Sequence, residues 1–358
     1  MARDGTRPRR PAVLAVDAGN SKADALLVDR TGRVAGAART LGQSNVGRAG
    51  GSVEPLSDVI AAAAMDAGLD HRVGSLAPVG VYCLAGADFR ADERRIERSL
   101  AERGWTRRNV IRNDTFAVLR AGTDRGWGVA VVCGAGMNCM GVGPSGRTVR
   151  FPALGPLSGD IAAGGEWAGL AALGAAIRAR DGRGPRTALE SAVARHFGSA
   201  TPEAVMKAMY RGRLSMERLV ELPPVVFEAA RAGDDVARRI LDRVADEVVA
   251  IVSATIRRLR VQRTDVDVIL GGGMFQAGDP TFFGRARDGV LTLAPRATVR
   301  ALAAPPIMGA ALLGLDEIGA SKRAATALRD DMNGVSLVAI EPGRAAASAD
   351  AAAPAGRR

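Results

Sequence analysis

The sequence predicts an α/β protein built from two related halves. Short apolar segments typical of strands alternate with longer segments whose apolar residues recur at helical spacing. Two stretches, one from residue 12 and one from residue 128, each open with an apolar strand, a glycine-rich turn and a hairpin. With 358 residues, the chain has the length of about two domains of roughly 150 residues each. These observations predict a duplicated α/β unit with helices inserted into the second copy.

The first half has the pattern of a mixed sheet flanked by helices. Asp29–Gly32 carries a hairpin signal, because Asp and Gly favour tight turns. We expect strands at residues 12–16, 23–28, 33–38, 79–84 and 109–112, and helices at residues 52–67 and 92–103.

The second half repeats the opening of the first and then becomes largely helical. Residues 234–260 place seven apolar side chains, from Val236 to Leu259, on one helical face. We expect strands at 128–133, 138–142, 148–151 and 266–270, and helices at 166–179, 186–197, 201–210, 216–232, 234–260 and from Pro306 through Leu315.

These elements predict two domains and two tails. The N-terminal domain comprises residues 11–118 together with about 306–322, and the C-terminal domain comprises 119–305 with its helical insertions. Residues 1–10 and about 340–358 are rich in Arg, Pro, Gly and Ala and lack a core pattern, so we expect them to be disordered.

Composition excludes several classes of function. The net charge is +11, but all but three of the 49 basic residues are scattered arginines, and aromatics are only 4%. This charge distribution does not indicate nucleic-acid binding, because aromatic side chains on which bases could stack are scarce. The three cysteines and two histidines have no metal-ligand or disulfide spacing. No apolar stretch approaches the ~20 residues of a membrane span. We expect a cytoplasmic protein without a membrane or nucleic-acid partner, for which a homodimer is compatible with the sequence.

Two glycine-rich turns are the first candidates for chemistry. Asp17–Lys22 joins two strands, and its backbone N–H groups and hydroxyl could form an anion nest. Asp17 could hold hydrated Mg²⁺, which prefers carboxylate and water ligands. Taken by itself, this segment is better explained as a plain hairpin turn. Gly134–Cys139 occupies the corresponding place in the second half, so the pair could face each other across a cleft and hold a polyphosphate.

Two further segments follow predicted strands. Asp114 comes directly after a strand and before a helical stretch, so it could be a helix N-cap or a general base. Gly271–Gly273 could let a flat ring approach the backbone, or could be a simple turn. A GxGxxG pattern at Gly141–Gly146 precedes a predicted strand rather than a helix, which argues against a dinucleotide site.

The combination of motifs resembles the BadF/BadG/BcrA/BcrD-type ATPases of the actin/hexokinase/Hsp70 superfamily, in particular their N-acetylglucosamine kinase branch. The resemblance covers about residues 12–318. It is carried, in chain order, by Asp17–Lys22, Asn113-Asp114, Gly134–Cys139, Ser158–Asp160, Asp181–Pro185 and Gly271–Gly273.

This resemblance implies a duplicated ribonuclease H-like fold with an interdomain cleft, and transfer of a phosphoryl group from ATP to the 6-hydroxyl of a sugar, with Mg²⁺ as cofactor. Asp17 would organise Mg²⁺ through water, and Asp114 would take the proton from the hydroxyl. Asn45, Asn113, Asp114 and Asp160 would contact the sugar. The implied ATP-binding residues are Gly19, Asn20, Ser21, Lys22, Gly134, Ala135, Gly136, Asn138, Gly271, Gly272 and Gly273.

One segment departs from the family pattern. The family has an acidic residue after the aspartate that matches Asp160, whereas this chain has Ile161. Glucosamine, N-acetylglucosamine or another amino sugar therefore remain open as substrates. Two other functions also stay open. One is an ATPase activator of a radical dehydratase or reductase, which would need cysteines for an iron–sulfur cluster. The other is a non-catalytic sugar or nucleotide sensor.

Overall fold

The computed structural model describes residues 10–42, 46–47, 50–71, 74–337 and 339–340. The chain divides into two compact units, which we call unit 1 (residues 1–124 and 303–358) and unit 2 (residues 125–302). The helix that begins at Pro306 belongs to unit 1. Among the helices that the structure describes, none is long and apolar enough to cross a membrane.

Unit 1 contains a six-stranded mixed sheet in the order β11-β3-β2-β1-β4-β5. Its strands are β1 (Val13–Ala18), β2 (Lys22–Val28), β3 (Val34–Leu41), β4 (Ala77–Leu84), β5 (Thr106–Asn113) and β11 (Ala339–Ile340). β2 runs antiparallel to β1 and β3, whereas β1, β4 and β5 are parallel. All six residues of β1 are buried, as expected of a central strand covered on both faces.

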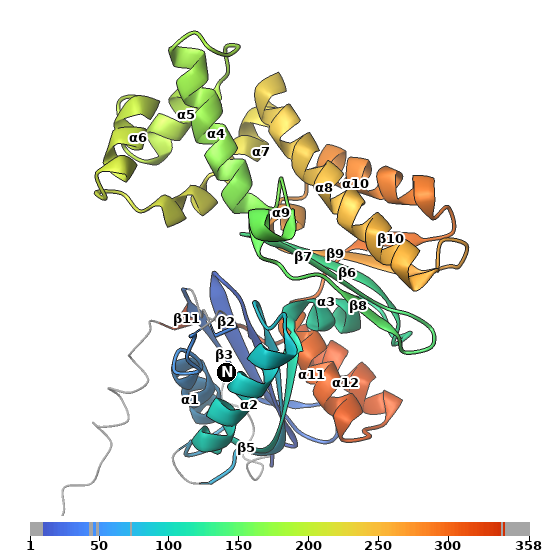
Figure 1. Ribbon diagram of the computed structural model, residues 1–358. Helices are drawn as coiled ribbons and strands as arrows, with labels where there is room; N and C mark the ends of the chain where they lie inside the picture. Colours follow the sequence, from blue (N-terminus) through green and yellow to red (C-terminus); the bar gives the residue numbers. More distant parts are fainter. Residues whose placement is uncertain (1–9, 43–45, 48–49, 72–73, 338, 341–358) are drawn as a thin grey trace, which may run out of the picture. The chain divides into compact units, whose positions relative to one another are not determined.

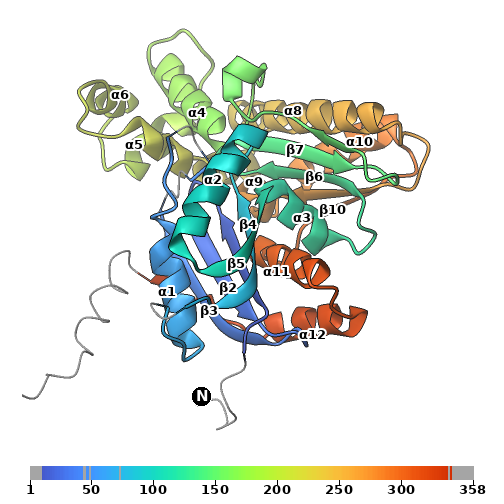
Figure 2. The same ribbon diagram turned by 60° about the horizontal axis from the view of Figure 1, so that its bottom comes forward.

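Helices cover both faces of the unit 1 sheet (Figures 1 and 2). They are α1 (Leu56–Asp66), α2 (Arg90–Arg103), α3 (Asp114–Gly122), α11 (Pro306–Glu317) and α12 (Lys322–Met332). Leu14 and Val16 pack in the apolar cluster that includes α1 and α2. Val13 points to the other face, against Gly314 of α11. Because strand side chains alternate, Asp17 shares the face of Val13 and points to the side covered by α3 and α11.

Unit 2 contains a five-stranded sheet in the order β10-β9-β6-β7-β8. Its strands are β6 (Gly128–Cys133), β7 (Met137–Val142), β8 (Thr148–Arg150), β9 (Asp267–Gly271) and β10 (Thr298–Ala301). The hairpin strands are antiparallel, and β9 lies parallel to β6 and β10. A turn connects β7 to β8 within the GxGxxG segment, and there the Gly143 amide donates to the Arg147 carbonyl at 2.8 Å.

The same strand order occurs in both units. The order β3-β2-β1-β4-β5 in unit 1 corresponds to β8-β7-β6-β9-β10 in unit 2, with an antiparallel three-stranded opening followed by two parallel strands in each. The predicted duplicated α/β unit is therefore confirmed.

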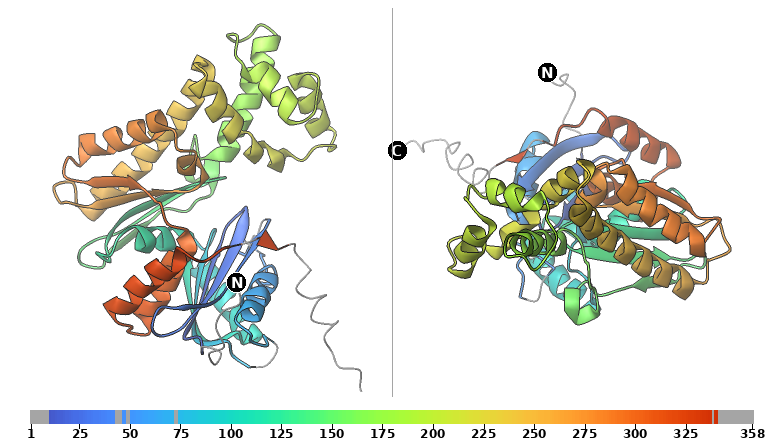
Figure 3. Two further views of the ribbon diagram at one scale, coloured as in Figure 1. Left: turned by 180° about the vertical axis from the view of Figure 1, so that it is seen from behind. Right: turned by 90° about the horizontal axis from the view of Figure 1, so that it is seen from above.

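The helices of unit 2 form a cover and a lateral group. α8 (Asp235–Leu259) packs on β6, β7 and β8, and α10 (Pro280–Leu293) packs on α8. Figures 1 and 3 show the lateral group beside the sheet. It consists of α4 (Gly165–Arg180), α5 (Leu189–His196), α6 (Pro202–Tyr210), the 3₁₀ helix η2 (Met216–Glu221) and α7 (Pro223–Arg231).

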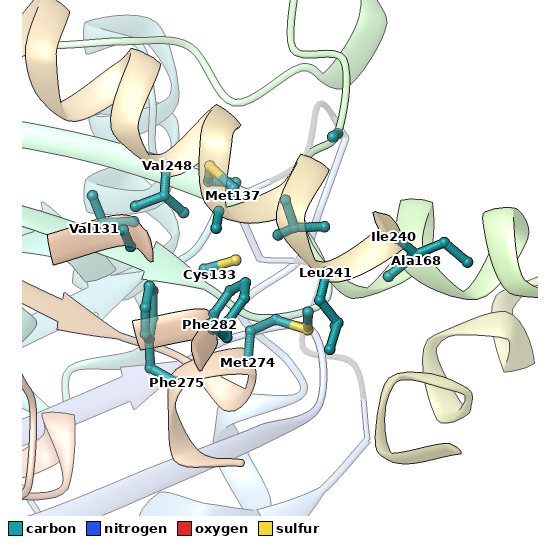
Figure 4. Close-up of a cluster of buried hydrophobic side chains, with 14 of the residues drawn as sticks. Val131, Cys133, Met137, Ala168, Ile240, Leu241, Val248, Met274, Phe275 and Phe282 are labelled. Carbon is teal, nitrogen blue, oxygen red and sulfur yellow. The ribbon is translucent and has the colours of Figure 1, made fainter. Parts of the chain in front are cut away.

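The core of unit 2 lies between α8 and the sheet. Figure 4 shows Phe282 beside Cys133 and Met274, beneath Leu241 of α8. The rings of Phe282 and Phe275 contact each other in a tilted arrangement, with centroids 5.0 Å apart. The apolar face predicted from residues 234–260 is buried here, which explains its helical period.

The predicted helix at 216–232 is wrong as a single element. It consists of η2 and α7, which meet at Leu222. Pro223 and Pro224 lack the N–H groups that a continuous helix would use, and they occupy the first turn of α7 instead.

Several elements were missed, and one tail begins later than expected. The sequence patterns did not predict α10, α12, β10 or the short helix α9 (Gly273–Gln276). The helix from Pro306 is not the last one, because α12 follows it. Ile340, expected in the C-terminal tail, pairs with Thr40 in the parallel ladder between β11 and β3. The remaining tail residues, 1–9 and 341–358, lie outside the described residues.

The close approach of α3 and α11 generates a first prediction. A Cβ atom at Gly309 would meet the backbone carbonyl of Ala117. Gly309→Ala should therefore lower the free energy of unfolding by about 2 kcal/mol through overpacking, measured by denaturant unfolding. Gly174→Ala in α4 is the control, because its Cβ would meet nothing within 4 Å and alanine favours helices. An equal loss in both variants would contradict the close packing.

Candidate active site

The turn between β1 and β2 presents backbone donors. The Gly19 amide donates to the Lys22 carbonyl at 3.0 Å, and the Ser21 carbonyl accepts from the Gly42 amide at 2.9 Å. In the described part of the chain, the amides of Asn20 and Ser21 donate to no protein acceptor. These two N–H groups and the exposed Ser21 hydroxyl form a small set of donors suited to an anion.

Asp17 is a buried carboxylate near this turn. It is 8% exposed, and it belongs to β1 rather than following a strand that ends at residue 16. Burial raises the pKa of its carboxyl to about 8, and the negative charges of Asp24 and Asp114 also raise it, while Lys22 lowers it. A cation close to Asp17 would relieve this unfavourable burial of negative charge.

Asp17 is the centre of a row of polar residues across the sheet. Cross-strand pairing places Arg39, Asp24, Asp17, Cys83 and Arg112 side by side on β3, β2, β1, β4 and β5. Directly paired residues point to the same face of a sheet. The two acids therefore lie together inside the sheet, with an arginine toward each edge.

Asp24 is fully buried and neutralised by two cations. Its carboxylate accepts from the Lys22 ammonium at 2.7 Å, and from Nε and Nη2 of Arg39 at 2.5 and 2.8 Å. Lys22 is thus held by its own strand, and its predicted contact with phosphate stays a prediction. The sequence motifs did not indicate Asp24 or Arg39. The available signal was an acidic residue inside the apolar segment that became β2.

Asp114 opens α3 and carries an unpaired buried atom. The residue is partly exposed, but its Oδ1 is buried and has no hydrogen-bond partner among the described residues. Burial and, to a smaller extent, the negative charge of Asp88 raise the pKa of this carboxyl to about 7, although the backbone N–H groups of Asp114 and Thr115 act to lower it. The atom can accept a proton from a bound hydroxyl, because nothing in the described chain competes for it.

Asn113 is the N-cap of α3 and is only 1% exposed. Its Oδ1 accepts from the Thr115 amide at 3.1 Å and from the Thr115 hydroxyl at 2.5 Å, and its Nδ2 donates to Asp88 Oδ1 at 2.9 Å. In this structure its side chain serves the start of the helix. The predicted contact with a sugar stays a prediction.

In the turn between β6 and β7, the carbonyl groups are hydrogen-bonded within the protein, whereas two amides are not. The carbonyls of Gly134 and Ala135 accept from the first two amides of α4, Gly165 at 2.7 Å and Glu166 at 2.8 Å. The Gly136 carbonyl accepts from the Gly134 amide at 2.9 Å. In contrast, the amides of Ala135 and Gly136 have no protein acceptor among the described residues. They remain available to an anion.

The other predicted ATP-binding residues have local structural duties. The Asn138 side chain accepts from the Cys139 amide at 2.7 Å. Gly271 ends β9 and Gly273 begins α9. Gly272 has a φ of +96°, and a Cβ there would meet the backbone of Cys133. Glycine is therefore required for close packing at residue 272, whatever ring approaches it.

Two predicted sugar residues remain. Asp160 lies in the segment between β8 and α4, where it accepts from the Ser158 hydroxyl at 2.5 Å. Its amide donates to the Gly155 carbonyl at 3.1 Å, which closes a tight loop around the 3₁₀ helix η1 (Gly155–Ser158). Asn45 lies outside the described residues.

The Asp17 carboxylate is a suitable ligand for a hydrated Mg²⁺ ion. Among the described residues, no group of three or more His, Cys, Asp or Glu side chains could hold a metal. Mg²⁺ does not need such a cage, because it commonly keeps several waters and takes one or two carboxylates together with phosphate oxygens. Asp17 meets that requirement as a single carboxylate whose charge has no strong ion pair.

The cysteines do not suit a shared iron–sulfur cluster. Cys83, Cys133 and Cys139 are all buried, and burial raises the pKa of each thiol above its ordinary value. Cys139 Sγ lies 3.2 Å from the Thr255 hydroxyl inside unit 2. A cluster bridging two copies of the chain needs thiolates that reach the surface.

Comparisons with solved structures give the fold class. A candidate N-acetylglucosamine kinase from Chromobacterium violaceum superposes with a TM-score of 0.66 and 25% identity, over 86% of this chain and 100% of that chain. A ROK family glucokinase from Streptomyces griseus, in complex with glucose and AMPPNP, has a TM-score of 0.52 and 18% identity, over 86% of this chain and 98% of that chain. The fold is that of the actin/hexokinase-type sugar kinases, as expected.

Within this class, the chain belongs to the BadF/BadG/BcrA/BcrD ATPase family, whose sequence profile matches residues 14–314. An N-acetylmuramic acid/N-acetylglucosamine kinase from Clostridium acetobutylicum is 30% identical over 58% of this chain and 68% of its own length. An N-acetyl-D-glucosamine kinase from Dictyostelium discoideum is 27% identical over 66% of this chain and 76% of its own length. The resemblance inferred from the motifs is confirmed.

The packing of Gly164 on the second turn predicts an effect on nucleotide affinity. A Cβ at Gly164 would meet the Gly136 carbonyl, so Gly164→Ala should displace the turn and raise the KM for ATP about tenfold, the value of one or two hydrogen bonds. Gly159→Ala is a matched control, because Gly159 also has a positive φ but its Cβ would meet nothing within 4 Å. Equal KM values in both variants would contradict the link.

The buried Asp17 carboxyl predicts a pH dependence of stability. Its pKa is raised from 3.8 to about 8 on folding, so the folded protein binds this proton more tightly than the unfolded chain does. The contribution of this carboxyl to stability is therefore fully present below the pKa of the unfolded chain, and it is lost as pH rises through the higher pKa of the folded protein. Asp17→Asn should melt at a higher temperature than wild type at pH 9, and the difference should vanish near pH 4. A constant difference across that range would refute this.

Proposed function

We propose that this protein is an ATP-dependent amino-sugar kinase that phosphorylates the 6-hydroxyl of N-acetylglucosamine or a related amino sugar. Family membership and the activities for which the Clostridium and Dictyostelium relatives are named support the reaction class. The observation that carries the proposal is the buried, unpartnered Oδ1 of Asp114 at the start of α3. A carboxylate oxygen with no protein donor is suited to accept a hydroxyl proton from a substrate.

Asp114 acts as the general base in this proposal. Its pKa of about 7 leaves a large ionised fraction at neutral pH while keeping the carboxylate basic enough to receive a proton. The proton passes from the sugar hydroxyl to Asp114 as the hydroxyl oxygen bonds to the γ-phosphorus and ADP leaves. Most of the catalysis in phosphoryl transfer comes from positioning and charge neutralisation, so the base mainly orients the acceptor.

Backbone amides and Asp17 hold the phosphates in this proposal. Each unit by itself offers two amides that could bind phosphate, those of Asn20 and Ser21 in unit 1 and those of Ala135 and Gly136 in unit 2. Mg²⁺ held through water by Asp17 would neutralise phosphate charge. Lys22 adds positive charge beside Asp24. Gly271–Gly273 and Asn138 border the nucleoside, and Asn45 and Asp160 contact the sugar, as the family resemblance implies.

A coupled ADP-release assay tests the proposal. ATP and Mg²⁺ are supplied with glucosamine, N-acetylglucosamine, N-acetylmannosamine, N-acetylmuramic acid or glucose in turn. We expect the strongest stimulation by an N-acetylated amino sugar, and ³¹P–¹H correlation of the product should place the phosphate on the 6-oxygen. Failure of every sugar to stimulate ADP release would overturn the kinase assignment, and sugar binding without turnover would indicate a sensor instead.

Asp114→Asn should lower kcat by roughly 10²–10⁴-fold, the usual contribution of a general base, with ATP affinity largely unchanged. In wild type, kcat/KM should fall about tenfold per pH unit below pH ~7, because Asp114 must lose its proton to act. Calorimetric ATP titration and a pH series measure both effects.

The control for this prediction is Asp124→Asn. Asp124 follows the end of α3 and pairs with Arg120 and Arg329 at 2.8 Å, so its loss should leave kcat and the pH profile intact. A loss of ATP affinity in Asp114→Asn as large as its loss of kcat would show that Asp114 is structural.

A further inference from the structure

The side-chain amide of Asn113 has its orientation determined by its partners. Its oxygen end receives two donors of Thr115, and its nitrogen end faces the Asp88 carboxylate, which in ionised form can only accept. Reversing the amide would break the bonds to the Thr115 amide and to Asp88, because a backbone N–H can only donate and an ionised carboxylate can only accept. The Asn113 side chain therefore connects the first turn of α3 to Asp88, which lies outside that helix.

Asp88 lies two residues after a turn, Ala85–Gly86, that is held from two sides. This turn follows β4, and the Ala85 amide donates to the Ala18 carbonyl at the end of β1 at 2.9 Å. On the other side, Gly47 packs so closely on Ala85 and Gly86 that a Cβ at Gly47 would meet their backbone. The backbone directly before Asp88 is thus restrained, which suits a residue that orients a reactive group.

The segment that carries Gly47 is itself fixed by α2. The Arg95 guanidinium donates to the carbonyls of Val46 at 3.0 Å, of Gly47 at 3.3 Å and of Gly51. Three carbonyls on one planar guanidinium hold the backbone more firmly than one bond would. Through Gly47, this arrangement restrains the turn that presents Asp88.

We infer that Asp88, acting through Asn113, is a positioning residue that sets the orientation of Asp114 for catalysis. The link is short: Asp88 Oδ1 to Asn113 Nδ2 is 2.9 Å, and Asn113 directly precedes Asp114. Asp114 Oδ1 has no hydrogen bond of its own, whereas the carboxyl interacts with the backbone N–H groups of Asp114 and Thr115, so its direction depends on the backbone at the start of α3. The inference rests on the proposed function, because it assigns Asp88 a role in presenting the proposed base. Nothing in the sequence motifs had pointed to Asp88.

Steady-state kinetics with ATP and N-acetylglucosamine test the inference. Asp88→Ala should lower kcat about tenfold to a hundredfold, the cost of a misplaced catalytic group, with the KM for ATP unchanged. Asp88→Asn should restore most of kcat, because the asparagine oxygen can still accept from Asn113. Asp92→Asn is the matched control. Its carboxylate caps the Phe89 amide at 3.2 Å in the same segment, so its kcat should equal that of wild type.

A second variant covers the case in which Asp88→Ala fails to fold. Asn113→Ser keeps an N-cap that suits a helix but loses the bond to Asp88. It should lower kcat as Asp88→Ala does, and the double variant should lose no more than either one alone, because both remove the same link. Additive losses, an unchanged kcat in either single variant, or no rescue by Asp88→Asn would overturn the inference.

A readout independent of catalysis separates this inference from the proposed function. With selective ¹⁵N-asparagine labelling, one Nδ2 proton of Asn113 should resonate downfield in wild type and Asp88→Asn, and should move upfield in Asp88→Ala. If wild type fails to phosphorylate N-acetylglucosamine while this pattern holds, the sugar assignment fails and the Asp88–Asn113 link stands. If the proton is unmoved in Asp88→Ala, the link itself is refuted.

Discussion

Negative charge held away from water is the constraint on which unit 1 depends. Asp17 and Asp24 lie in central strands of the sheet and Asp114 begins the helix that follows β5, and of these three acids only Asp24 receives direct cationic partners. Burying a carboxylate without a partner costs enough that its pKa rises instead, as it does for Asp17 and Asp114. A cation bound near Asp17, or a hydroxyl that donates to Asp114, would therefore stabilise these two buried carboxyl groups. Buried polar groups without a protein partner can bind a ligand, whereas buried polar groups in a core already have their partners within the protein.

In unit 2, the groups proposed to bind phosphate are backbone amides rather than side chains. Its turn between β6 and β7 has all three carbonyls engaged within the unit, two of them by the start of α4. Because each peptide has a donor and an acceptor pointing in opposite directions, engagement of the carbonyls on one side leaves amides available on the other. Gly164 makes this approach possible, since any side chain there would meet the Gly136 carbonyl. The phosphate-binding capacity proposed for this turn thus depends on a contact 28 residues away in the chain.

Asp88, Asn113 and Asp114 extend the same reasoning from binding to catalysis. The unpaired buried oxygen of the proposed base is available to accept a proton. Its orientation, however, must be fixed by other groups. The turn after β4, restrained by Ala18, Gly47 and Arg95, supplies such a support. The helix macrodipole at the start of α3 also favours a negative charge at Asp114. Binding, orientation and basicity are therefore distributed over β1, β4 and α3 rather than concentrated in one motif.

The sequence by itself determined the local features of this protein. Apolar period and turn residues located most strands and the long helix of residues 235–259, and the order of glycine-rich turns and Asp114 indicated the family. These are properties of neighbouring residues, which local sterics and solvation decide. Only the tertiary structure decided that residues 216–232 form two helices and that Ile340 adds a strand. It alone decided that Arg39 neutralises Asp24, and that Asp88 reaches Asn113. Each of these depends on which distant backbone lies opposite, and pairing register and close packing are settled by the whole unit, not by a local segment.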